Sequence, residues 1–279
     1  MVQHVGHTLE NESSVQDASR LWRCVAHFEM TDGDLLNIRN SARRDELSVG
    51  GDHRMKGLRS YLAQGYWVRF VDIRDNFEFG HEFCGPHRIR GATSPNSGRP
   101  LLQLLKLHLT DTRLNLSYPD VSILPLLFSW TCDISQGPLL YQLIDETAIE
   151  ILRYRAGAAY QDFPYPGYPE HFPVKLVSLV PLSIEEQSTI RKVNNEETDQ
   201  VYGLRPDLCR PEHQVGGEPF LVQPWIELSC PKCSRGMPFL ASIGDHSGST
   251  TGFTGNIFVQ TIFSLCVSCR TIGAYQQCD

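Results

Sequence analysis

Alternating apolar and polar positions run through most of the chain and predict a protein built mainly from β-strands. In residues 21–30 the side formed by Trp22, Cys24, Ala26, Phe28 and Met30 is wholly apolar, which is typical of a half-buried strand. Further strands are predicted over 66–73, 78–83, 101–109, 126–134 and 175–180. Runs of this kind, separated by turn residues, favour antiparallel sheets.

One pair of apolar segments allows two interpretations. Residues 138–144 and 148–154 flank the polar residues 145–147, as in a β-hairpin. Ile144, Ala148 and Ile151 also fit the stripe of an amphipathic helix. We predict the hairpin and keep a helix over 139–155 as the alternative.

A helix is predicted after the strand at 175–180. Ser183 and Glu186 are spaced as a capping box, in which the serine and the glutamate satisfy free amides at a helix start. The helix should end near Asn195. Prolines recur in 161–173 and predict a loop that covers the edge of the core, with peptide or sugar binding as the alternative. Residues 1–20 predict a loosely packed terminus, and the polar run up to residue 60 an exposed helix and loop.

Two Cys-x-x-Cys pairs, Cys230 with Cys233 and Cys266 with Cys269, are the strongest chemical signal in the chain. Zinc binds four thiolates tetrahedrally, and two tight turns that each present two thiolates complete its coordination. Apolar runs at 236–243 and 256–265 lie between the pairs. We therefore predict a zinc-ribbon hairpin over 225–279 that holds one structural Zn²⁺. Ordinary reduced cysteines or a redox pair are the alternatives.

Composition narrows the class of protein. The chain has 279 residues, of which 41% are hydrophobic and 20% charged, which suits a globular protein. A net charge of −7 argues against a nucleic-acid-binding surface, which needs a basic field. Nine cysteines, an odd number, favour a reducing cytoplasm over a disulfide scaffold. The apolar stretches are too short to span a bilayer, and no leader pattern follows Met1.

His81, Cys84 and His87, which are spaced three residues apart, are candidates for a second metal site. Three soft ligands so close together can chelate zinc, but Gly85 and Pro86 force a turn between them. We therefore prefer a structural loop. His213, which precedes Gly216 and Gly217, is expected to lock a turn, with ligand binding as the alternative.

No catalytic motif specifies a reaction. Ser247 and His246 are neighbours in a loose Gly- and Ser-rich loop, where they are not a positioned nucleophile and base. The sequence therefore predicts a protein that is not an enzyme.

The chain also resembles itself. His87 to Gly91 matches His213 to Gly217 in the spacing of a histidine, an apolar residue and a glycine. The strands predicted at 101–109 and 126–134 then correspond to apolar runs at 237–243 and 257–265. This pattern indicates an internal duplication, with the cysteine pairs inserted in the second copy.

Residues 213–223 and 230–245 carry a His-x-x-Gly-Gly-x-Pro segment, then Cys-x-x-Cys and Met-x-Phe-Leu. In these features the chain resembles the YwqG-like family of bacterial proteins, and more distantly the zinc proteins of the programmed cell death 2 type. The resemblance implies an α+β fold of duplicated antiparallel sheets without known enzymatic activity. It divides the chain into a segment 1–80, packed on the core, and a β-rich domain 81–279.

These observations lead to one functional expectation with two alternatives. We expect a cytoplasmic, zinc-stabilised protein that binds another protein, with a toxin as the partner that some family members imply. The alternatives are an escort for a basic protein and a metal-dependent hydrolase that uses His81, Cys84 and His87.

Overall fold

A computed structural model describes residues 57–71, 79–95, 98–129, 138–153, 170–195, 213–221, 223–245 and 259–278. The predictions for 1–56 and for Ser247 lie outside these residues, as does most of the loop predicted at 161–173.

The described residues form an eleven-stranded sheet, a separate two-stranded sheet and one α-helix. The strands of the large sheet are β1 (Tyr66–Phe70), β2 (His81–Phe83), β3 (Leu102–His108), β4 (Ile123–Phe128), β5 (Leu139–Asp145), β6 (Ala148–Arg153), β7 (Lys175–Pro181), β8 (His213–Val215), β11 (Phe239–Asp245), β12 (Val259–Cys266) and β13 (Thr271–Cys278). The small sheet pairs β9 (Leu228–Ser229) with β10 (Gly236–Met237), and the helix is α2 (Ile184–Asn195). Short 3-10 helices are η2 (Thr112–Leu114) and η5 (Val267–Cys269).

The large sheet has the order β4-β3-β2-β7-β1-β8-β11-β12-β13-β5-β6 and its strand pairs are antiparallel. The chain is therefore a strand-rich α+β protein, as the sequence predicts. β5 and β6 pair as a hairpin, so the helix over 139–155 is wrong.

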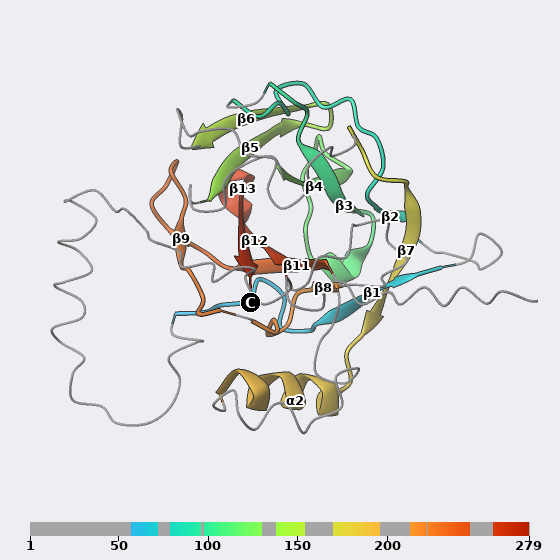
Figure 1. Cartoon of the computed structure of the whole chain (residues 1–279), viewed down its shortest axis with the longest axis vertical. Helices are drawn as coiled ribbons and strands as arrows, with labels where there is room; N and C mark the ends of the chain where they lie inside the picture. Colours follow the sequence, from blue (N-terminus) through green and yellow to red (C-terminus); the bar gives the residue numbers. More distant parts are fainter. Residues whose placement is uncertain are drawn as a thin grey trace, which may run out of the picture.

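The capping box at the start of α2 forms as predicted. The Ser183 backbone N–H donates to the Glu186 carboxylate at 2.7 Å, and the Glu186 N–H donates to the Ser183 hydroxyl at 3.1 Å. Ile190, on the buried side of the helix, packs with Leu182, Phe220 and Trp67. This contact seats α2 beside the sheet (Figure 1).

The sheet curves round so that its two ends approach each other (Figure 1). The buried Tyr141 of β5 reaches the outer edge of β4, where its hydroxyl donates to the Pro125 carbonyl and accepts from the Leu127 N–H, both at 2.9 Å. A phenol therefore satisfies part of an edge that would otherwise need another strand. The main hydrophobic core lies inside this curve and draws on β1 to β8 and β11 to β13.

The sheet contains a structural repeat that supports the duplication indicated by the sequence. β2, β3 and β4 are consecutive in the sheet, and β8, β11 and β12 are consecutive in the same way. The register shifts between Gln103 and Leu105 in the first group and between Phe239 and Ala241 in the second. The residues at these shifts, Leu104 and Leu240, accept equivalent hydrogen bonds from Cys84 N and Gly216 N.

The repeat corrects the sequence match in one respect. His81 begins β2 just as His213 begins β8. His108 N donates to His81 Nδ1 at 3.0 Å, and Gly244 N donates to His213 Nδ1 at 3.3 Å. The residue equivalent to His213 in the first copy of the repeat is therefore His81, whereas His87 lies in the loop that follows β2.

The two groups of strands are also interlocked. β1 precedes β2 in the chain but pairs with β8, whereas β7 precedes β8 but pairs with β2. β1 and β7 pair with each other at the centre of the sheet. Residues 66–70 therefore form an internal strand of the same sheet that the later strands build.

Candidate metal centre

The first cysteine pair lies in the turn between β9 and β10. Cys230 N donates to the Arg235 carbonyl at 2.9 Å, and Ser234 N donates to the Cys230 carbonyl at 2.8 Å. Ser234 has a φ of 58°, the left-handed conformation that closes the turn. These contacts form a compact knuckle, residues 230–235, in which Cys230 is buried and Cys233 half-buried.

The second pair lies in the tight connection from β12 to β13. β12 ends at Cys266, and η5 consists of Val267 to Cys269. Arg270 then has a φ of 51°, a left-handed conformation that reverses the chain direction into β13. Cys266 is buried and Cys269 half-buried. Residues 266–270 are therefore a second knuckle, attached to strands inside the large sheet.

The two knuckles bring their four cysteines together, as the sequence predicts. All four Sγ atoms lie within 4.8 Å of one another, and Cys233 Sγ is 3.6 Å from Cys266 Sγ. Tetrahedral zinc with Zn–S bonds of about 2.3 Å separates its sulfurs by about 3.8 Å, whereas a disulfide separates them by about 2 Å. The donor set and its spacing therefore fit a tetrahedral metal ion.

The electrostatics of the four thiols also suit a cation. Arg235 Nε donates to Cys233 Sγ at 3.5 Å, and this contact lowers the pKa of Cys233 to about 6. The neighbouring Cys233 sulfur raises the pKa of Cys269 to about 12. Four adjacent thiols cannot all ionise alone, because each thiolate disfavours the next. A bound divalent ion removes this conflict.

Several contacts join the second knuckle to the rest of the protein. Gln142 of β5 donates to the Cys269 carbonyl at 3.0 Å. Arg270 donates to both carboxylate oxygens of Asp120 at 2.7 and 2.9 Å, and Tyr118 donates to the Val267 carbonyl at 3.2 Å. The cysteine cluster is thus a junction of the sheet and no isolated appendage.

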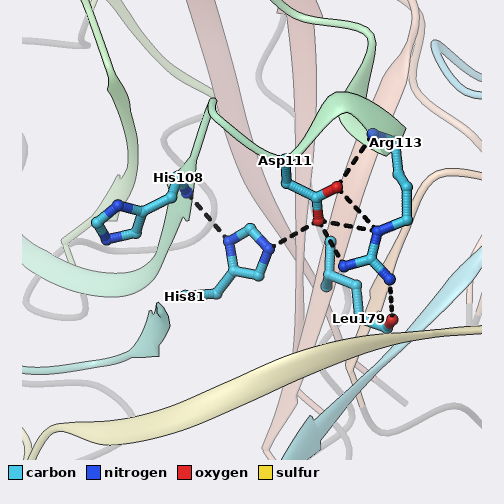
Figure 2. A network of polar contacts seen from close by, with 5 residues as sticks. All are labelled: His81, His108, Asp111, Arg113 and Leu179. Carbon is cyan, nitrogen blue, oxygen red and sulfur yellow. Dashed lines mark hydrogen bonds and ion pairs between the residues drawn. The ribbon is translucent and has the colours of Figure 1, made fainter. Parts of the chain in front are cut away.

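His81 belongs to a buried polar network (Figure 2). Its Nδ1 accepts a hydrogen bond from His108 N, so its Nε2 carries the ring proton. Nε2–H therefore donates to Asp111 Oδ2 at 3.0 Å. Arg113 binds the same carboxylate through Nε at 2.8 Å and Nη2 at 2.6 Å, and its Nη1 donates to the Leu179 carbonyl at 2.9 Å. The network joins β2, β3, η2 and β7.

The charges in this network are held in one arrangement. Burial lowers the pKa of His81, and Asp111, which acts in the opposite direction, does not overcome it. Burial acts to raise the pKa of Asp111, but hydrogen bonds from Arg113 and His81 outweigh it and the pKa stays below its ordinary value. The network therefore contains a neutral histidine and an ion pair, with both histidine nitrogens engaged.

The other two members of the candidate site, His87 and Cys84, are also occupied within the protein. His87 Nε2 donates to the Leu101 carbonyl at 2.6 Å, and its Nδ1 accepts from Ile89 N at 3.3 Å. Cys84 is buried, and burial raises the pKa of its thiol. Among the described residues, His81, Cys84 and His87 are not brought together as a metal site. Cys84 and His87 lie in the loop that follows β2, whereas His81 is the first residue of β2 itself.

Comparison with models of known protein families gives no match, and no curated protein sequence matches the chain. Within the described part of the chain, every helix is too short or too polar to cross a membrane.

Three important residues were not singled out from the sequence. Asp111 and Arg113 complete the His81 network, and Arg235 contacts the cysteine cluster. Arg235 follows Cys233 by two residues, so the sequence alone indicates that this arginine lies near the cysteine cluster. The contact between Asp111 and His81 forms only because β2 and β3 pair in the sheet, and no short sequence pattern predicts it.

Proposed function

We propose that this chain is a non-enzymatic, zinc-stabilised protein that acts by binding another protein. The observation that carries the proposal is the set of four cysteine thiolates that converge from two knuckles. Four protein ligands fill a tetrahedral ion, so no position is left for water or substrate. Such a centre stabilises a fold and does not activate a substrate.

The chemistry of the ligands supports zinc as the ion. Thiolates are soft ligands, and a tetrahedral set of four sulfurs is typical of zinc or iron–sulfur sites. Cys84 and the four cysteines of the cluster are free thiols, which agrees with the reducing cytoplasm that the cysteine count favours. In this proposal Cys230, Cys233, Cys266 and Cys269 hold one structural Zn²⁺.

The acidic charge supports a basic partner. A net charge of −7 accelerates association with a surface of opposite sign. A secreted toxin that the chain neutralises is the partner we propose, following the resemblance to the YwqG-like family, some members of which imply a partner of this kind. An escort for a nascent basic protein uses the same charge and is the alternative outcome.

Capture from the native host tests the proposal, with the tagged, zinc-loaded chain as bait and Cys230→Ser as its control. We expect one partner at stoichiometric amounts that reforms the complex from purified components, weakens as salt is raised, and binds the variant less well. If the partner is a toxin, co-expression of the chain must relieve its toxicity. A ribosomal protein would support the escort. Recovery of no partner at low salt would contradict both forms of the proposal.

A further inference from the structure

Arg235 contacts both knuckles of the cysteine cluster at once. Its Nε donates to Cys233 Sγ at 3.5 Å, in its own knuckle. Its Nη2 donates to the hydroxyl of Ser268 in the other knuckle. That hydroxyl lies 3.7 Å from Cys266 Sγ. One guanidinium therefore links a sulfur of the first pair to a sulfur of the second, directly and through one hydroxyl.

The backbone of Arg235 is fixed in the same knuckle. Its carbonyl accepts from Cys230 N at 2.9 Å. The side chain therefore starts from a defined position and spans a short distance. Its placement follows from the turn that also positions the cysteines.

We propose that Arg235 is a positioning residue of the metal centre, which holds the two knuckles together and offsets the negative charge of the four thiolates. The proposal rests on the metal site of the proposed function. A divalent ion with four thiolates has a net charge of about −2. A cation at its surface therefore stabilises the loaded state, as outer contacts of metal ligands commonly do.

Arginine is the suitable residue for this position. Its planar guanidinium presents donors in two directions, so it can bind a sulfur and a hydroxyl together. The ammonium of lysine is a point charge on a flexible stem and supplies charge without the same bridge.

Two other cations near the cluster serve elsewhere. Lys232 pairs with Glu150 at 3.4 Å, and Arg270 pairs with Asp120 at 2.7 Å. Their charges are directed at carboxylates, whereas Arg235 is directed at the thiol groups. Lys232 belongs to the same knuckle as Arg235 and makes this salt bridge outside the thiol cluster. It is therefore the matched control.

The test compares the zinc affinity of the full chain with that of Arg235→Gln, Arg235→Lys and Lys232→Gln, by competition with a chromophoric chelator. The Co²⁺-loaded forms report the tetrahedral geometry through their visible absorption. We expect Arg235→Gln to bind zinc about 10- to 100-fold more weakly, the range found when outer contacts of metal ligands are removed. Arg235→Lys should fall between it and the wild type.

Lys232→Gln should stay within about twofold of the wild type, because its ammonium is not directed at a sulfur. Wild-type affinity for zinc in Arg235→Gln would overturn the proposal and leave the metal site intact. An equal loss in Lys232→Gln would also overturn it, because charge alone would then explain the effect. Failure of the wild-type chain to bind any metal would contradict the proposed metal site itself.

Discussion

At the scale of single residues, the protein interior contains a buried network of charged and polar side chains. Asp111 is fully buried, and its carboxylate binds His81 and the forked donors of Arg113. Removing one partner from such a pair leaves a buried charge uncompensated. The network therefore stabilises one arrangement of the strands it joins, and it makes the fold sensitive to pH.

The pKa of His81 sets the sign of this pH dependence. Because its pKa is lower in the folded protein than the ordinary value, the unfolded chain binds more protons below about pH 6.5. Stability is therefore full above this pH and falls as the pH drops toward the folded pKa of His81. A further loss follows below about pH 3.9, where Asp111, whose folded pKa is lowered, becomes protonated in the unfolded chain.

We predict that His81→Gln reduces the first of these two losses and leaves the smaller part that the lowered pKa of His108 contributes. Glutamine reaches toward Asp111 without titrating, although it leaves the His108 N–H without its acceptor and should cost about 1 to 3 kcal/mol at neutral pH. Urea unfolding between pH 4 and 8 measures both effects, with the exposed His171→Gln as control. A wild-type profile that stays flat from pH 7 to 5 would contradict the account.

At the scale of elements, the turns that end β2 and β8 fix the structural repeat. Gly216 and Gly217 have φ values of 65° and 63°, and Cys84 and Gly85 have positive φ at the equivalent places. A Cβ on Gly216 would lie 2.6 Å from the Gln64 carbonyl oxygen. The turn therefore needs glycine both for its conformation and for the close approach of another segment.

Gly216→Ala should destabilise the protein by about 3 kcal/mol or more, since left-handed strain and overpacking add. Gly98 offers a matched control, because it also has a positive φ of 68° but has open space where a Cβ would stand. Gly98→Ala should cost only about 1 kcal/mol. The free energies of unfolding of the two variants check this difference, and equal losses would show that the close contact has no effect.

Features that depend on neighbouring residues were predictable from the sequence. The capping box of α2, the β5–β6 hairpin and both cysteine knuckles follow from spacings of a few residues. The duplicated histidine was predicted at His87, although His81 also precedes an apolar residue at two positions and a glycine at four. The spacing does not separate these two histidines, whereas the strand pairing and the hydrogen bonds to Nδ1 of His81 and His213 do.

At the scale of the whole molecule, the pairing of the cysteine-bearing strands with the first half of the chain was not predictable. The sequence placed the cysteine pairs in the second copy of the repeat, and β11, β12 and β13 lie within the large sheet, but β13 also pairs with β5. This pairing joins residues more than a hundred positions apart, and no local pattern specifies it. A metal ion bound by the four cysteines would therefore stabilise the sheet as well as the two knuckles.

The central claim is that Cys230, Cys233, Cys266 and Cys269 bind one structural zinc ion. Elemental analysis of the purified chain, combined with its thermal unfolding, tests this claim most directly. The account predicts about one zinc per chain, because four thiolates complete one tetrahedral ion. It predicts loss of the metal and a lower unfolding temperature in Cys230→Ser and Cys266→Ser, since metal binding adds to folding stability. Cys84→Ser, which alters a buried cysteine outside the cluster, should keep its zinc. A metal-free wild type, or full zinc content in Cys230→Ser, would contradict the account.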